Sequence, residues 1–382
     1  MERAATRAPW IAAALLTGTM IISGCEGGAA DPNSSPSAAG STPAASPSSS
    51  GSSSATPAPS ATGVAEAGDP SDFATDLTTP WGLVALSDGS VLVSERDTAV
   101  IKKVTDGRSS EIGTVEGVVP SSEGGLLGLA ISSDEKTLFA YVSTGEDNRI
   151  VSYDFDGSSL GTEKVLLDQI PVSSNHNGGQ LIMGPDGFLY AATGDASVRE
   201  DAQDTGSLAG KILRLTTDGK AAPDNPFDNE VFSYGHRNVQ GLAFDEQGRL
   251  WASEFGDQSL DELNLITAGA NYGWPAIEGD ESELDGMINP VHVWGTDDNS
   301  PSGLAHAQGS LWMGGLRGER LWQIPLEGDR AGEPVAHVED RGRLRGVLAY
   351  ENDILVATSN TDGRGDPRDA DDRLLLVPLE RA

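Results

Sequence analysis

Cysteine is almost missing from this 382-residue chain, which contains only Cys25. Both a disulfide within the chain and a covalent haem site of the CxxCH type need two cysteines, so the sequence excludes both. Basic residues are also scarce: 25 Lys and Arg stand against 58 Asp and Glu, for a formal net charge of −33. Such a chain repels nucleic acid, which we exclude as a partner. Arginines that gather locally in so acidic a chain instead indicate an anionic ligand.

The N-terminal part lacks the composition of a folded domain. Two arginines precede an apolar run over residues 10–22, which is too short for an ordinary membrane span. The tetrapeptide ISGC fits a bacterial lipobox, so residues 1–24 are predicted to be a lipoprotein signal peptide and Cys25 the lipidated residue; an ordinary signal peptide with an incidental cysteine is the alternative. Residues 25–70 contain no aromatic residue and are rich in Ser, Pro, Ala and Gly, which predicts a disordered linker. We therefore expect an extracytoplasmic protein held on the outer face of a bacterial cell membrane by its lipid anchor alone.

Helical periodicity is nearly absent from residues 71–382, where a different pattern recurs six times. Each repeat has a small residue, a short alternating apolar run, a turn rich in Asp, Asn or Gly, and a second apolar run, which is typical of a β-hairpin. The repeats begin near Gly82, Gly128, Gly179, Gly241, Gly303 and Gly346. Further strand candidates lie between them, and four strands per unit at intervals of about 40 to 60 residues are typical of propeller blades. We predict an all-β fold, a six-bladed β-propeller; a two-domain sandwich is the alternative.

The stretch NHNGGQLIMGPDGFLYAATGD, residues 175–195, contains one of only five histidines, His176, at the mouth of a predicted hairpin. An imidazole is well suited to accept a proton near neutral pH. Its position alone, however, favours a surface histidine beside a turn. Further along the chain, Arg343 and Arg345 alternate along a predicted strand, so both point to the same face. The run DGRGDPRDADD, residues 362–372, is typical of a solvated turn and less often of a metal-binding loop.

Four longer motifs carry a resemblance to a known family. They are NHNGGQL followed by GPDG and TGD, then GHRNVQGLAF, then SEFGD followed by DELNLI and NYGWP, and finally RLRGV. In this order they resemble the soluble quinoprotein sugar dehydrogenases of the glucose/sorbosone dehydrogenase family, from about residue 72 to the C-terminus. The resemblance implies a six-bladed propeller that uses pyrroloquinoline quinone (PQQ) and calcium to oxidise sugars.

The resemblance also implies catalytic roles. His176 would take the proton of the anomeric hydroxyl while hydride leaves C1 for the quinone, and Asp195 would orient the imidazole. Arg237 and Asn238 would bind the reactive quinone oxygen, where a guanidinium stabilises the developing negative charge. The product would be a lactone, and the electrons would pass to a separate acceptor.

The remaining implied cofactor contacts come from several blades. They are Glu123, Trp294, Thr296, Arg317, Arg343 and Arg345. Glu123 stands where the better-known members have glutamine, Arg317 replaces a lysine, and Asn175 replaces an acid before the histidine. Core packing is the alternative for Trp294, and an ion pair with one of the many carboxylates is the alternative for each arginine.

Two calcium sites are implied as well. The backbone carbonyls of Gly256 and Asp257 would hold the calcium that contacts the cofactor; Asp257 replaces the family's proline. Glu278 and Asp280 would contribute to a second, structural calcium site, although Ser282 stands where a further acid is expected. We therefore expect a PQQ- and calcium-dependent aldose dehydrogenase, monomeric or homodimeric. A calcium-dependent lactonase and a cell-surface propeller that binds a glycan or a partner protein are the alternatives.

Overall fold

Strands account for nearly all the regular structure of residues 64–280, 286–328 and 330–380, the part of the chain that the computed structural model describes. This part includes one short 3₁₀ helix, η1 (Arg199–Gln203). The predicted signal peptide, Cys25 and most of the predicted linker lie outside the described residues. No helix in the described part is long and apolar enough to cross a membrane.

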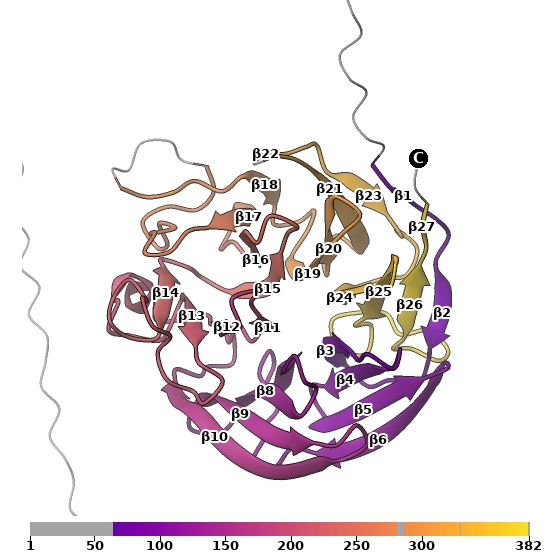
Figure 1. Cartoon of the computed structure of the whole chain (residues 1–382). Helices are drawn as coiled ribbons and strands as arrows, with labels where there is room; N and C mark the ends of the chain where they lie inside the picture. The colour runs from indigo at the N-terminus through magenta and orange to yellow at the C-terminus, as the bar shows by residue number, and fades with distance from the viewer. Residues whose placement is uncertain (1–63, 281–285, 329, 381–382) are drawn as a thin grey trace, which may run out of the picture. The chain divides into compact units, whose positions relative to one another are not determined.

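Six antiparallel sheets stand in a ring, with one innermost strand of each sheet facing the centre (Figure 1). Blade 1 contains β3 (Pro80–Ala85), β4 (Val91–Glu95), β5 (Val100–Thr105) and β6 (Arg108–Thr114). Blade 2 contains β7 (Leu126–Ile131), β8 (Thr137–Ser143), β9 (Asn148–Phe155) and β10 (Leu160–Ile170). Blade 3 contains β11 (Leu181–Met183), β12 (Leu189–Ala192), β13 (Lys211–Leu215) and β14 (Val231–Tyr234).

The later blades follow the same plan. Blade 4 contains β15 (Val239–Phe244), β16 (Leu250–Glu254), β17 (Leu260–Ile266) and β18 (His292–Gly295). Blade 5 contains β19 (Pro301–Ala307), β20 (Ser310–Gly315), β21 (Arg320–Glu327), β22 (Arg330–Ala331) and β23 (Val335–His337). Blade 6 contains β24 (Leu344–Tyr350), β25 (Asp353–Thr358), β26 (Leu374–Val377) and β2 (Ser71–Ala74). The six predicted hairpins form the two inner strands of the six blades, so the predicted six-bladed β-propeller is confirmed.

Blade 6 joins the two ends of the propeller. Its outer strand β2 comes from the N-terminal side and pairs with β26 in the register Ser71↔Leu376. Beside it, β1 (Glu66–Ala67) pairs with β27 (Leu379–Glu380). Ala65 is buried, and its carbonyl oxygen accepts a hydrogen bond from Gln323 at 2.6 Å. Regular structure therefore begins a few residues before residue 70, where the linker is predicted to end, because these residues pair with β27 and contact blade 5.

The hydrophobic core is divided among the contacts between blades. Each of its six clusters joins side chains of neighbouring blades, and the cluster between blades 2 and 3 also includes Trp81 of blade 1. Between blades 1 and 2, for example, Leu92 and Ile101 pack with Leu126 and Leu138, all fully buried. A single blade therefore buries its apolar faces only when both neighbours are present, which is why the repeat must close into a ring.

The small residue at the start of each repeat lies where neighbouring innermost strands touch. These strands contact one another around the whole ring. A Cβ added to Gly82 would lie 2.7 Å from the carbonyl oxygen of Leu127 in the next blade, closer than real Cβ atoms come. Added Cβ atoms would also meet the next blade's backbone at Gly128, Gly241, Gly303 and Gly346. Gly179 instead faces Leu127 of the preceding blade. We call these six residues the glycine ring.

The glycine ring predicts a sharp difference between two glycine substitutions. Gly82→Ala should lower the free energy of unfolding by about 3 kcal/mol, the upper range for overpacking a rigid site, because its Cβ meets backbone that cannot rotate away. Gly145→Ala is the control, since its Cβ would meet nothing nearer than 3.9 Å. Urea denaturation followed by circular dichroism measures both; equal stability of the two variants would show that the blades can separate at this point.

Candidate active site

The segments that precede the innermost strands meet at one end of the ring. Five of these segments each contribute one residue, and these residues are Glu123, His176, Asn238, Ser300 and Arg343. They line two adjoining polar cavities of about 300 and 200 Å³, which share part of their walls. The opposite ends of the innermost strands line a mainly apolar cavity of about 540 Å³. The two polar cavities therefore lie at the end at which the innermost strands begin.

His176 and Asp195 form a hydrogen-bonded pair at the wall of the smaller cavity. Nδ1 of His176 lies 2.7 Å from Oδ1 of Asp195, and the carboxylate is fully buried. Burial would raise the pKa of Asp195, but the hydrogen bond and charge of His176, together with the N–H groups of Ser197 and Trp274, lower it below 3.8. The carboxylate is thus ionised at neutral pH and fixes the Nδ1–H tautomer, which leaves Nε2 of His176 as the free ring nitrogen.

The backbone of His176 adopts a left-handed conformation (φ 58°), which is uncommon for residues other than glycine. Three contacts hold it there. Its N–H donates to Oε2 of Glu123 at 2.9 Å, and its carbonyl oxygen accepts the N–H of Ala196 at 3.1 Å. The same carbonyl packs directly on Gly194, where any Cβ would overlap it. The glycine of the TGD motif is therefore required for the position of the histidine.

Trp274 connects this pair to two arginines. Its Nε1–H donates to Oδ2 of Asp195 at 2.8 Å. The guanidinium carbons of Arg237 and Arg199 lie 5.4 and 5.0 Å from the centroid of its ring. A single buried indole thus orients the carboxylate behind the histidine and stacks with the cation beside the cavity.

Arg237 is buried and held by several partners. Its backbone N–H donates to Glu254, and its guanidinium forms an ion pair with Asp257 at 3.1 Å. Its Nε is buried with no hydrogen-bond partner among the described residues. The neighbouring Asn238 uses Oδ1 to accept the N–H of Gly178 at 3.0 Å, which ties the two loops together.

Arg343 and Arg345 lie side by side in the larger cavity, as their alternation predicts. Oδ2 of the buried Asp362 lies 3.0 Å from Arg343 and 3.7 Å from Arg345. Gln240 accepts a further hydrogen bond from Arg345 at 3.1 Å. Burial and the charge of Arg96 lower the pKa of Arg345 to about 9, so it stays charged at neutral pH. One carboxylate serves two buried guanidiniums, which leaves this wall with positive charge for an anion.

Two further predicted residues lie at the mouth of the cavities. Arg317 lines both cavities and pairs with Asp297 at 2.7 Å, although both side chains are largely exposed. Such an exposed ion pair is weak, so Arg317 can readily exchange Asp297 for another anion. Thr296 lines the smaller cavity, and its N–H donates to the carbonyl oxygen of Ser259 at 3.3 Å.

The loop between β16 and β17 is organised by Glu278. Oε1 of Glu278 accepts four successive backbone N–H groups, which belong to Asp257, Gln258, Ser259 and Leu260, at 2.7 to 3.1 Å. In a trans peptide the C=O points opposite to the N–H of the next residue. The carbonyls of Gly256 and Asp257 therefore point away from Glu278, and no donor among the described residues bonds to them.

Comparison with known proteins places this geometry in a family. Residues 77–375 match the family model described as Glucose / Sorbosone dehydrogenase. The chain belongs to this family. The aldose sugar dehydrogenase of Escherichia coli is 30% identical over 74% of this chain and 88% of its own length. Quinoprotein glucose dehydrogenase B of Acinetobacter calcoaceticus is 33% identical over 59% of this chain and 56% of its own.

A solved structure resembles the propeller closely. The PQQ-bound aldose sugar dehydrogenase of Streptomyces coelicolor is 49% identical and has a TM-score of 0.80, over 85% of this chain and all of that one. The resemblance inferred from the motifs is thereby confirmed, and the chain is an oxidoreductase of the sugar dehydrogenase type.

Most of the site residues that the family resemblance implies lie close together in the structure. The residues that line the two cavities are Glu123, His176, Arg237, Asn238, Gly256, Asp257, Thr296, Arg317, Arg343 and Arg345. Trp294 does not line either cavity. It packs in the core between blades 4 and 5, 7% exposed, so the structure favours the packing alternative for it.

The second calcium site that the resemblance implies is less well formed than the loop of Gly256 and Asp257. Glu278 already accepts four N–H donors on one oxygen, which leaves only Oε2 for a metal, and Asp280 is exposed. Ser282 lies outside the described residues. Within the described part of the chain, no three His, Cys, Asp or Glu side chains are arranged around a metal position. A structural calcium ion here remains a prediction.

Sequence reasoning did not single out several residues that line or support the site, including Asp261 and Ser300. Four others show where the signal was hidden. They are Trp274, Gln240, Asp362 and Arg364. Trp274 lies within the NYGWP motif and Gln240 within GHRNVQGLAF. The motifs therefore pointed to these two residues, although neither received a role of its own. Asp362 and Arg364 lie in the run that was interpreted as a solvated turn, because its composition is the same whether it faces water or a cavity.

The depressed pKa of Asp195 predicts how its replacement changes stability with pH. An ionised carboxylate with a lowered folded-state pKa contributes stability above about pH 4, and this is lost as the pH falls through the folded-state value. Asp195→Asn should therefore cost about 2 kcal/mol at pH 6 and less at pH 3. Urea unfolding of both proteins at both pH values measures this; an equal cost at the two pH values would contradict an ionised, hydrogen-bonded Asp195.

Proposed function

We propose that this sugar dehydrogenase uses PQQ and calcium to oxidise the C1 hydroxyl of an aldose to a lactone, by hydride transfer to the quinone. The observation that carries the proposal is the polar end of the propeller, where a histidine held by a buried carboxylate adjoins a cavity lined by arginines. In a chain with a net charge of −33, such a cavity is matched to a small anion. The PQQ-bound state of the Streptomyces coelicolor relative supports the identity of that anion.

The residues of the larger cavity fit a cofactor with three carboxylates. Its walls carry Arg317, Arg343, Arg345 and Arg364, and Glu123 is the one acid among the described residues that line it. The guanidiniums would hold carboxylates through forked hydrogen bonds. When bound, PQQ supplies the hydride acceptor.

The His176–Asp195 pair accounts for the proton. With Nδ1–H directed to Asp195, the free Nε2 accepts the proton of the sugar's C1 hydroxyl as hydride departs. The buried carboxylate of Asp195 then stabilises the imidazolium. Arg237, fixed by Asp257 and by Trp274, would hold a positive charge beside the bound acceptor and stabilise the negative charge that it gains.

The loop of Gly256 and Asp257 would hold the calcium ion. Their carbonyl oxygens point away from Glu278, and both residues line the smaller cavity. Burial raises the pKa of Asp261, which accepts the N–H of Gly256, to about 6. Buried acid beside outward carbonyl oxygens fits a hard cation, which would polarise the bound acceptor.

The catalytic role of His176 predicts a large loss of rate without loss of cofactor binding. His176→Ala should reduce dye-linked oxidation of aldoses by a factor of about 10² to 10⁴ in the presence of PQQ and calcium, because the base is removed. Its affinity for PQQ, followed by absorbance titration, should stay close to that of the wild type, since the arginines remain. His306→Asn is a matched control, because His306 lines the apolar cavity at the other end.

The outcomes of this assay separate the alternatives. Wild-type protein that neither binds PQQ nor oxidises any aldose would overturn the proposal. Calcium-dependent hydrolysis of lactones would then favour a lactonase. Calcium-supported glycan binding without turnover would favour a binding propeller.

The lipoprotein motif predicts where the enzyme works. We infer that Cys25 carries a lipid, that the Ser- and Pro-rich linker spaces the propeller from the outer face of the membrane, and that electrons pass to a separate acceptor there. In a bacterial host the wild type should fractionate with membranes, and Cys25→Ser should move to the soluble extracytoplasmic fraction with unchanged dye-linked activity. A Cys25→Ser protein that stays with membranes would contradict the anchor.

A further inference from the structure

Glu123 is an acid in a cavity otherwise lined by arginines and uncharged residues, among those described. It cannot turn away, because its Oε2 accepts the N–H of His176 at 2.9 Å and its own N–H donates to the carbonyl oxygen of Ser174 at 3.1 Å. Its side chain is only 18% exposed. An unpaired carboxylate here would repel any anionic ligand of the cavity.

Arg364 supplies the missing partner. Its guanidinium lies 3.3 Å from Oε1 of Glu123 and donates to Oγ of Ser122 at 3.1 Å. It reaches across from blade 6 to the segment before blade 2, and it lines the same cavity as Arg343 and Arg345. Half of its side chain stays exposed, so it is open to a ligand as well as to Glu123.

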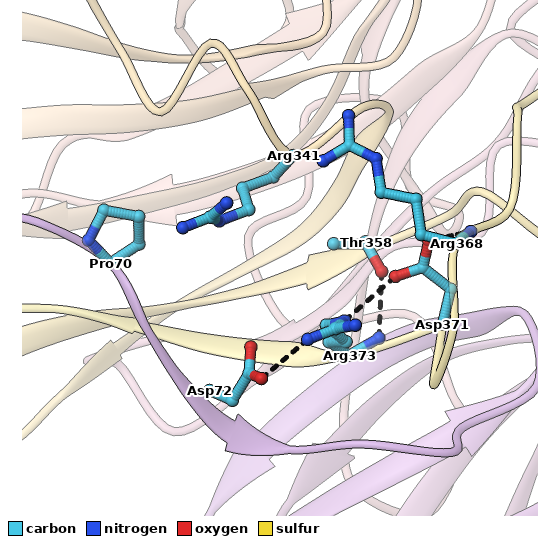
Figure 2. A pocket seen from close by; sticks show the side chains of 7 residues that line it. All are labelled: Pro70, Asp72, Arg341, Thr358, Arg368, Asp371 and Arg373. Atoms are coloured by element: carbon cyan, nitrogen blue, oxygen red, sulfur yellow. Dashed lines mark hydrogen bonds and ion pairs between the residues drawn. The ribbon is translucent and has the colours of Figure 1, made fainter.

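The segment that carries Arg364 is fixed at both ends. At its start, Asp362 accepts the backbone N–H of Arg364 at 2.9 Å while it pairs with Arg343. At its end, Arg373 forms ion pairs with Asp371 at 3.2 Å and with Asp72 of β2 at 2.6 Å (Figure 2). The strand that closes the ring therefore also fixes the segment that brings Arg364 to the cavity.

We propose that the ion pair of Arg364 with Glu123 neutralises this acid within the cavity, so that an anionic cofactor binds beside it. The inference rests on the proposed use of PQQ. It explains how the position can hold a carboxylate, which gives the N–H of His176 a strong charged acceptor, at no electrostatic cost to cofactor binding.

Opposite charge changes at the two positions should shift PQQ affinity in opposite directions. The full-length protein is titrated with PQQ in excess calcium and followed by absorbance. Arg364→Ala should weaken binding about fivefold, because Glu123 is then uncompensated, and Glu123→Gln should tighten it by a similar factor. The double variant should return close to the wild type, and Arg364→Lys should retain most of the affinity.

Arg368→Ala is the matched control on the same segment. Arg368 lines a different pocket, with Arg341 and Arg373 (Figure 2), and does not line the cavity of Glu123, so its removal should leave PQQ affinity unchanged. Thermal melts of the cofactor-free variants check that each one folds.

The possible results separate this inference from the proposed function. If wild-type protein does not bind PQQ, both fail. If the wild type binds, but Arg364→Ala has no effect, or Arg364→Ala and the double variant are weakened equally, only the compensation of Glu123 by Arg364 is overturned.

Discussion

The contact between neighbouring innermost strands at the glycine ring is the constraint on which the rest of the structure depends. Because Gly82 and its counterparts have no side chain, backbone of one blade can lie against backbone of the next. The six hydrophobic clusters between blades then form around this contact, and all innermost strands begin at the same end. The segments before those strands consequently meet in one place, so residues far apart in sequence, such as His176 and Arg343, share a site.

The electrostatics of that site are the reverse of the chain's average. The protein carries 58 acids against 25 Lys and Arg, yet four arginines line one small cavity. Each buried cation is held by a fixed carboxylate: Asp362 beneath Arg343 and Arg345, and Asp257 beside Arg237. These acids offset the penalty of burying the arginines without neutralising them all, which leaves an anion as the missing partner. The charges on the acidic exterior are solvated, so they do not need a fixed partner of opposite charge.

The sequence predicted what depends on local pattern. Period-2 runs joined by turns rich in Asp, Asn or Gly specify each hairpin. His176 and Asp195 flank one hairpin, and Arg343 and Arg345 are two apart on one segment, so both pairings follow from short-range geometry. Contacts that form only when the ring closes could not be predicted from the sequence. Nothing local distinguishes β2, a strand of four residues, as the partner of β26, or Arg364 in an Asp- and Gly-rich turn as the partner of Glu123. Likewise the sequence around Trp294 does not reveal that its ring packs between blades 4 and 5.

Trp274 makes the two halves of the proposed chemistry a single rigid unit. Oxidation of an alcohol by hydride transfer creates positive charge on the base and negative charge on the acceptor at the same time. Here Asp195 is held against the imidazole and Arg237 lies beside the cavity, and the same indole donates to the first and stacks with the second. Arg237 in turn pairs with Asp257, whose N–H is fixed by Glu278, so the loop of Gly256 and Asp257 belongs to the same unit. Charges that are already oriented need not reorganise as the reaction proceeds, which is the main way in which a polar site lowers a barrier. The ion pair between Arg237 and Asp257 thus links the guanidinium beside the cavity to this loop.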